Sequence, residues 1–122
     1  MRNGESGFTL IELLVVLAII ATLTTLVAPK YFQQIDRAKE VVLKHNLKML
    51  RLSIDQYRRD RGFSPEELES LVSDGYLRQL PIDPVTDKRD SWQVKRDDAG
   101  QLIDVHSGSQ KNSLQGMPYA NW

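Results

Sequence analysis

Three side chains near the carboxyl end have the types that a hydrolase uses for nucleophilic catalysis, namely Asp104, His106 and Ser107. A serine nucleophile needs a histidine within hydrogen-bond reach and a carboxylate that orients the histidine. In a β-strand Asp104 and His106 share one face, whereas Ser107 points to the other face. The residues around Ser107 also lack the pattern of a strained nucleophile elbow. We therefore expect no catalytic site here and predict that the chain is not an enzyme.

A single carboxylate, Glu12, lies inside an otherwise apolar run from Phe8 to Ala28. Of the 21 residues in this run 16 are apolar, and a helix of that length crosses the roughly 30 Å hydrocarbon core of a membrane. The rest of the chain has too little apolar surface to bury such a helix. A carboxylate within a membrane helix costs about 2.5–3.5 kcal/mol on insertion scales, so Glu12 needs a partner or a function. The alternative is a glutamate near the helix end that reaches the membrane surface.

Composition excludes several classes of site. The 122 residues include no cysteine, so the chain has neither a disulfide scaffold nor a thiolate metal site. The 16 basic residues balance 16 acidic residues. Nine basic and four acidic residues lie in 29–61, whereas six basic and ten acidic residues lie in 62–122. Such a division usually marks a solvated helix face, and we expect no nucleic-acid partner.

The pattern after Pro29 changes from uniformly apolar to amphipathic. One stripe has the 4-3-4-3 spacing of a buried helix face and consists of Leu43, Leu47, Leu50, Ile54 and Tyr57. An adjoining stripe contains Tyr31, Ile35, Ala38, Val42 and Met49, and the opposite side carries Lys44, Lys48, Arg51, Asp55, Arg58 and Arg59. We predict one helix from Phe8 to about Arg61, ended by Gly62 and kinked at Pro29, because proline removes a backbone donor. A coiled coil is the alternative for the second half, but the shortage of clean heptads favours packing against a small sheet.

Two groups on this helix invite a binding hypothesis. His45 lies between the apolar and basic faces, and we predict a surface or half-buried side chain there instead of a metal ligand. Arg58, Arg59 and Arg61 near Tyr57 could contact phosphates and stack a base. A solvated helix end is the preferred interpretation.

Residues 64–90 predict a short helix followed by a loop. The sequence Ser64-Pro65-Glu66-Glu67 matches a capping box with proline at the first helical position. The helix it predicts continues through Leu71 and ends at Gly75. The loop covers 76–90 and contains two prolines and several aspartates.

The remaining residues predict a β-hairpin and an irregular tail. Runs at 92–95 and 102–106 have the composition of strands, and the residues 97–100 between them supply a turn. Residues 107–122 are rich in Gly, Ser, Asn and Gln. We expect this tail to be held by the packing of three aromatic side chains, those of Trp92, Tyr119 and Trp122.

The amino-terminal residues resemble the class III signal of type IV pilins and type II secretion pseudopilins. The resemblance rests on Gly7-Phe8-Thr9-Leu10-Ile11-Glu12 and the apolar residues that follow. It implies that a prepilin peptidase cuts between Gly7 and Phe8 and that Phe8 becomes N-methylated. It also implies that Glu12 meets the amino-terminal amine of a neighbouring subunit during filament assembly, where pairing reduces the cost of a charge in a low-dielectric environment. The expected divisions are a leader at 1–7, a transmembrane and filament-core half-helix at 8–29, an amphipathic half-helix at 30–61 and a small globular region at 62–122.

The later residues resemble the G-type major pseudopilin. This resemblance rests on Tyr76-Leu77, on Leu80-Pro81-Ile82-Asp83-Pro84, on Asp104-Val105 with Ser107-Gly108-Ser109, and on the final Tyr119-Ala120-Asn121-Trp122. It implies an α+β, pilin-like fold in which the long helix packs on a small domain with a short helix and an antiparallel hairpin. Calcium often binds the last loop in this family, yet no Asp or Glu occurs from Val105 to Asn121. We therefore predict no cofactor and assign no metal ligand, with a weak calcium site as the alternative.

The expected function is that of a structural subunit in the periplasmic pseudopilus of a type II secretion system. The resemblance implies a single-pass protein of the bacterial inner membrane with its carboxyl-terminal domain in the periplasm. The implied partners are membrane lipid, copies of the chain and other pseudopilins, the prepilin peptidase, and the assembly platform with its ATPase. One alternative is a minor type IV pilin with a role in adhesion, motility or DNA uptake. Another is a single-span periplasmic binding module that never polymerises.

Overall fold

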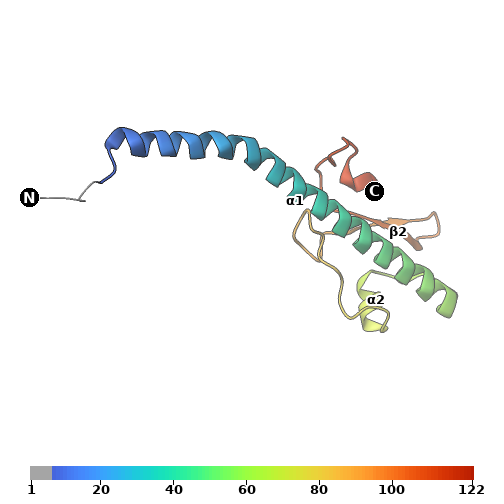
Figure 1. Cartoon of the computed structure of the whole chain (residues 1–122). Helices are drawn as coiled ribbons and strands as arrows, with labels where there is room; N and C mark the ends of the chain where they lie inside the picture. Colours follow the sequence, from blue (N-terminus) through green and yellow to red (C-terminus); the bar gives the residue numbers. More distant parts are fainter. Residues whose placement is uncertain (1–6) are drawn as a thin grey trace, which may run out of the picture. The chain divides into compact units, whose positions relative to one another are not determined.

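A computed structural model describes residues 7–122 and divides the chain into two compact units, the first ending at Ile35 and the second spanning Asp36–Trp122. Helix α1, Leu10–Arg61, contributes to both units (Figure 1). The long helix that the sequence predicts is thus confirmed, with its start two residues later than expected. Pro29 lies inside α1. The kink expected there stays a prediction.

The first unit is the apolar part of α1. The Leu13 N–H donates to the Thr9 carbonyl at 3.1 Å, which closes the first helical turn. The large apolar side chains of this part are exposed, for example Leu10 at 76% and Leu26 at 67%. Because exposure of apolar surface to water is unfavourable, this helix needs lipid or protein around it.

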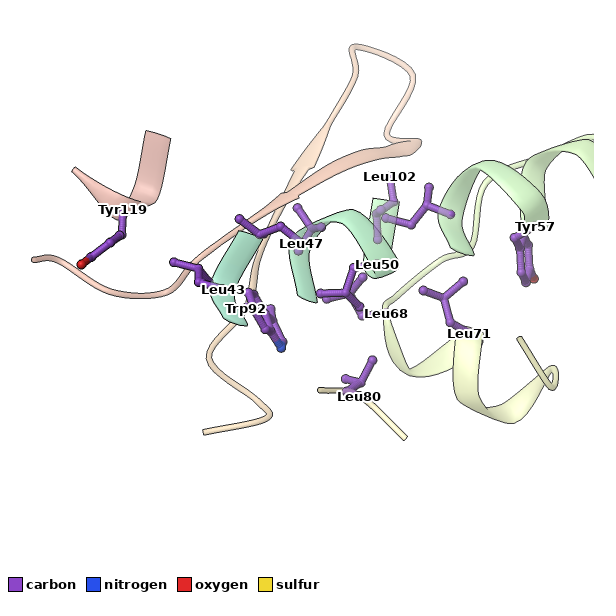
Figure 2. Close-up of a cluster of buried hydrophobic side chains, with 12 residues drawn as sticks. Leu43, Leu47, Leu50, Tyr57, Leu68, Leu71, Leu80, Trp92, Leu102 and Tyr119 are labelled. Atoms are coloured by element: carbon purple, nitrogen blue, oxygen red, sulfur yellow. The ribbon is translucent and has the colours of Figure 1, made fainter. Parts of the chain in front are cut away.

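The second unit has its core on one face of α1 (Figure 2). The five residues of the predicted 4-3-4-3 stripe are all buried: Leu43, Leu47, Leu50, Ile54 and Tyr57. They join one buried cluster with residues of the short helix, the loop, the hairpin and the tail, among them Leu71, Leu80, Trp92, Leu102 and Tyr119. The expected packing against a small sheet is therefore confirmed. The adjoining stripe lies outside this core, with Val42 46% and Met49 38% exposed.

Helix α2 is shorter than predicted and covers only Glu69–Ser73. The capping box expected at Ser64 is wrong, because Leu68 precedes α2 and no side chain caps the helix. Ser64 is buried instead, and its N–H donates to Gln101 Oε1 at 3.0 Å. The Ser64 backbone is thus fixed by a tertiary contact with Gln101 and does not start a helix. The predicted end is confirmed: Gly75 has a φ of 86°, which glycine adopts without strain.

Strands β1, Gln93–Arg96, and β2, Leu102–His106, form an antiparallel hairpin in which Val94 pairs with Val105. The first strand begins and ends one residue later than expected. Trp92, just before it, is buried in the core, and its Nε1–H donates to the Pro81 carbonyl at 2.9 Å. In the turn, Asp97 Oδ1 accepts the N–H of Gln101 at 2.8 Å. The hairpin and its turn are confirmed.

The carboxyl-terminal residues 107–122 are irregular apart from the 3₁₀ turn η1, Tyr119–Asn121. The rings of Tyr119 and Trp122 lie 5.2 Å apart in an edge-to-face arrangement. Trp92 belongs to the same buried cluster as Tyr119, and Trp122 packs against that cluster, so the three aromatic side chains of the prediction meet there. Gly108 passes so close to Ser91 that a Cβ would lie 1.9 Å from its carbonyl oxygen. The α+β fold class that the sequence predicts is confirmed.

Candidate functional site

The apolar start of α1 has the length and composition of a membrane span. The helix contains an 18-residue window with a mean hydropathy of 2.6, and none of that window is buried. A helix pairs its backbone polar groups within the segment itself, as a hydrocarbon environment requires. The membrane-anchoring segment predicted from the sequence is therefore present as an exposed helix.

Three threonines within the span satisfy their hydroxyl groups inside the helix. Thr22 and Thr24 donate to the carbonyl oxygens four residues earlier at 2.8 Å, and Thr25 donates to the Thr22 carbonyl at 2.6 Å. Such bonds remove the cost of an unpaired hydroxyl in an apolar medium. With these hydroxyl groups paired, the remaining polar side chain of concern is Glu12, the one charged residue from Phe8 to Ala28.

Glu12 forms a capping box with Thr9 at the start of α1. The Glu12 N–H donates to Thr9 Oγ1 at 3.1 Å, and the Thr9 N–H donates to Glu12 Oε2 at 3.4 Å. Each side chain satisfies a backbone donor that the helix start leaves free, and the positive end of the helix dipole favours the carboxylate. Our sequence reasoning missed this motif, although the Thr-x-x-Glu spacing at 9–12 was visible.

The predicted cleavage point lies just before this capping box. Gly7 is exposed, and a Cβ built on it would meet no atom within 4 Å. Phe8 is 82% exposed. Most of the predicted leader, residues 1–6, lies outside the described residues. Within residues 7–122, the bond between Gly7 and Phe8 therefore lies outside the folded elements and their contacts.

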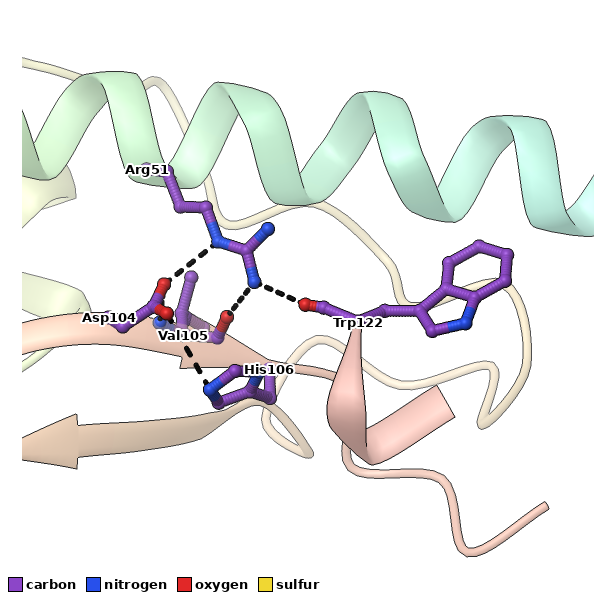
Figure 3. A network of polar contacts seen from close by, with 5 residues as sticks. All are labelled: Arg51, Asp104, Val105, His106 and Trp122. Atoms are coloured by element: carbon purple, nitrogen blue, oxygen red, sulfur yellow. Dashed lines mark hydrogen bonds and ion pairs between the residues drawn. The ribbon is translucent and has the colours of Figure 1, made fainter. Parts of the chain in front are cut away.

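Arg51 connects the helix, the hairpin and the tail of the second unit (Figure 3). Its Nε donates to Asp104 Oδ1 at 2.8 Å. Its Nη2 donates to the main-chain oxygens of Val105 and Trp122, at 2.9 and 2.5 Å. The sequence placed Arg51 on the solvent side of the helix, and the structure corrects this, because a long side chain can turn toward acceptors more than fifty residues away.

Asp104 receives more than one stabilising contact in this cluster. Burial acts to raise the pKa of Asp104, but hydrogen bonds from the Val105 N–H and from Arg51 outweigh it, and the pKa lies below its ordinary value. His106 Nε2 lies 3.6 Å from Asp104 Oδ2. The carboxylate is therefore held in its charged form by protein donors.

Glu40 is the second helix residue that binds the tail. Its Oε1 accepts the Leu114 N–H at 2.7 Å and the Tyr119 hydroxyl at 2.9 Å. Burial, followed by the hydrogen bond to Glu40, raises the pKa of Tyr119 to about 12. Sequence reasoning gave Glu40 no role, because its partners lie 74 and 79 positions later in the chain.

The hydrolase residues do not form a catalytic triad. Ser107 is buried and donates to Asp83 Oδ2 at 2.5 Å, so its hydroxyl is engaged with a carboxylate and not with His106. His106 Nδ1 is buried without a hydrogen-bond partner among the described residues. Asp83 also accepts the Val85 N–H at 2.9 Å, which makes it an organiser of the loop.

Two of the three arginines at the end of α1, Arg59 and Arg61, contact nearby groups, and Arg58 is exposed. The Cζ atom of Arg61 lies 4.9 Å from the ring centre of Tyr57, and its Nη2 lies 3.8 Å from Asp74 Oδ1. Arg59 donates to Gln56 Oε1 at 3.0 Å. Tyr57 is buried, so its ring offers no platform for a base, whereas His45 is exposed as predicted. This geometry gives no support to the nucleic-acid hypothesis.

Known proteins match both the amino-terminal segment and most of the chain. Residues 2–28 match the family model described as the prokaryotic N-terminal methylation motif. The chain is 37% identical over 99 residues to type II secretion system core protein G of Pseudomonas aeruginosa, covering 68% of this chain and 70% of that protein. The protein of the same name from Xanthomonas campestris is 29% identical over 127 residues, covering 97% of this chain and 87% of that protein. No solved structure matches the chain.

Proposed function

The chain belongs to the family of type II secretion system core protein G, and we propose on this premise that it is cut after Gly7, methylated at Phe8 and polymerised through its apolar helix. The pseudopilin role follows from the family and from the methylation motif at residues 2–28. Assembly with other pseudopilins is part of that role. The observation that carries the proposal is a membrane-length apolar helix, exposed in the single chain, with one carboxylate in its first turn.

The position of the cut has physical support in the residues around it. Gly7 has no side chain to obstruct a peptidase, and Phe8 makes no packed contact that cleavage would have to break. The intact mass of the chain recovered from membranes tests this step. We expect a chain that begins at Phe8 and carries one methyl group. An unmodified chain that begins at Met1 would refute it.

Glu12 is proposed to select the position of each incoming subunit. Cleavage creates a positive amine at Phe8, and a carboxylate surrounded by apolar side chains is stabilised by such a charge on a neighbouring chain. The capping box with Thr9 gives the carboxylate one backbone donor before assembly. A single long hydrogen bond of 3.4 Å leaves most of the charge uncompensated, so attraction to a second chain remains.

Two substitutions separate the charge of Glu12 from its capping role. Glu12→Gln retains a side chain that can complete a capping box but removes the charge, whereas Glu12→Ala removes both. We expect both variants to insert into the membrane and to be cut, and both to fail in filament assembly. Filament yield after overexpression, measured against the amount of processed chain, provides the readout. Normal assembly of Glu12→Gln would overturn the pairing mechanism. In that case, a failure of Glu12→Ala to assemble would be due to the loss of the cap.

We further propose that the span lies in the inner membrane with the second unit in the periplasm. The prepilin peptidase, the assembly platform and its ATPase are the proposed partners, together with membrane lipid. The chain supplies structure and self-assembly, and we propose no catalytic activity for it. Labelling of a cysteine introduced at exposed Asp98 by a membrane-impermeant reagent, before and after outer-membrane permeabilisation, tests the orientation.

Deletion of the gene tests the role in the cell. We expect loss of exported proteins from the medium with surface pili unchanged, and restoration by the intact chain but not by Glu12→Gln. Loss of pili or twitching with normal secretion would replace this proposal by the minor type IV pilin alternative. Loss of neither would leave the single-span binding module.

A further inference from the structure

The tail at 107–122 is the place where the family resemblance implies calcium, and its donor set does not fit that ion. Calcium takes six to eight oxygen ligands, usually with several carboxylates among them. From Val105 to Asn121 the sequence contains no Asp or Glu. Within residues 7–122, no group of three or more His, Cys, Asp or Glu side chains is arranged to hold a metal ion. The tail must therefore be held by other contacts.

Arg51 supplies a positive charge where chain oxygens converge. One carboxylate oxygen and two main-chain oxygens lie within 2.9 Å of its guanidinium nitrogens, from Asp104, Val105 and Trp122. Oxygens of these kinds are also the ligands of a hard cation. The guanidinium occupies their meeting point and joins β2 to the last residues of the tail (Figure 3).

Glu40 supplies a negative charge on the same side of α1. It lies eleven residues before Arg51, which is about three helical turns, so the two side chains leave one face of the helix. Glu40 Oε1 receives both the Leu114 N–H and the Tyr119 hydroxyl. Between them, Lys44 places its Nζ 4.8 Å from the ring centre of Trp122. The tail thus has three contacts along one face of α1.

Main-chain hydrogen bonds inside the tail satisfy several of its polar groups. The Ser113 N–H donates to the Met117 carbonyl at 2.8 Å, and the Tyr119 N–H donates to the Lys111 carbonyl at 3.0 Å. Among the described residues of the tail, the Ser113 hydroxyl is the one buried side-chain group without a partner. One hydroxyl is far from the ligand set that calcium needs.

We propose that Glu40 and Arg51 hold the carboxyl-terminal tail closed in place of a metal ion, so that this chain folds its last loop without calcium. The proposal concerns folding and does not depend on the proposed function. In this respect the chain would differ from family members whose last loop binds calcium. One consequence does rest on the proposed function: a secretion system built on this subunit would not need calcium to close this loop.

The first test measures the full-length chain in detergent with calcium and with a chelator. Trypsin cleavage after Lys111 reports local opening of the tail, because Lys111 lies inside it and its carbonyl is bonded to Tyr119. We expect the same cleavage rate and the same unfolding temperature in EGTA and in about 1 mM calcium, a concentration at which extracellular calcium modules bind. Terbium luminescence sensitised by Trp122 should show no saturable binding. Slower cleavage in calcium, or saturable terbium binding, would overturn the proposal.

The second test removes each charge and compares it with a matched control on the same helix. Glu40→Ala and Arg51→Met are expected to raise cleavage after Lys111 by roughly tenfold or more, because each removes two or more charge-assisted hydrogen bonds. The controls are Asp55→Ala and Lys48→Met, which remove exposed side chains of the same charge from the same helix. Both controls should cleave at the rate of the unaltered chain. Equal rates for Glu40→Ala and Asp55→Ala, or for Arg51→Met and Lys48→Met, would refute the roles of Glu40 and Arg51.

Discussion

Asp83 is a fully buried carboxylate whose removal should destabilise the second unit strongly. It is 0% exposed, its Oδ1 accepts the Val85 N–H at 2.9 Å, and its Oδ2 accepts the Ser107 hydroxyl at 2.5 Å. A third, longer bond of 3.4 Å comes from the Thr86 N–H. Asp83 therefore joins the loop before the hairpin to the residue that follows β2.

The magnitude follows from the two short bonds. A hydrogen bond to a charged group contributes about 1.5–3 kcal/mol, so the loss of two such bonds in Asp83→Ala should lower the free energy of unfolding by about 3–6 kcal/mol. Asp83→Asn keeps the acceptor for Val85 and can donate to the Ser107 oxygen. That exchange leaves the Ser107 proton without its acceptor, which should cost about 1–2 kcal/mol. The two substitutions should thus be clearly ranked.

Urea unfolding of the full-length chain in detergent, followed by tryptophan fluorescence, measures both values. Trp92 is a suitable reporter because it is buried and bonded to Pro81, two residues from Asp83. Asp90→Ala serves as the control, since Asp90 is an exposed aspartate of the same loop. If Asp83→Ala unfolded within about 1 kcal/mol of the unaltered chain, the loop would not depend on this carboxylate and the reasoning would fail.

Three further predictions concern the second unit. The pKa of Asp104 is lowered in the folded chain. The charged Asp104 side chain therefore stabilises the fold fully above the ordinary Asp pKa of about 3.9, and this stabilisation is lost as pH falls through the folded pKa. Asp104→Asn should remove this acid-side loss from a curve of the free energy of unfolding against pH. Leu50→Ala should cost about 2–5 kcal/mol because Leu50 is 0% exposed, whereas Leu52→Ala, at a residue 53% exposed, should cost under about 1 kcal/mol in the same urea measurement. Gly108→Ala would place a Cβ 1.9 Å from the Ser91 carbonyl oxygen, and we expect a loss of about 3 kcal/mol or more, read as a lower unfolding temperature.

Local sequence patterns predicted the elements whose residues are close together in the chain. The 4-3-4-3 stripe identified the buried face of α1, because helix periodicity and burial depend on the same spacing. The hairpin was predicted for a similar reason, since a turn at 97–100 separates its two strands. In both cases neighbouring residues decide the structure.

The predictions failed for side chains and backbone groups whose hydrogen-bond partners lie far away in the sequence. Ser64 has the pattern of a helix cap, but the Gln101 side chain 37 positions later binds its N–H. Arg51 has the spacing of a solvent-facing residue, but Asp104 and Trp122 provide acceptors. Helical phase alone cannot reveal such partners, and the same limit hid the role of Glu40.

The long separation of these partners has a consequence for the order of folding. Glu40 and Tyr119 are 79 positions apart, and Arg51 and Asp104 are 53 apart. A helix forms within about a microsecond, whereas contacts between distant positions require closure of long loops and form more slowly. During that interval the apolar stripe of α1 lacks its cover and is available to proteases and to other chains. The yield of folded subunit therefore depends on how fast the tail and hairpin dock, and a variant can lower yield while its native state remains equally stable.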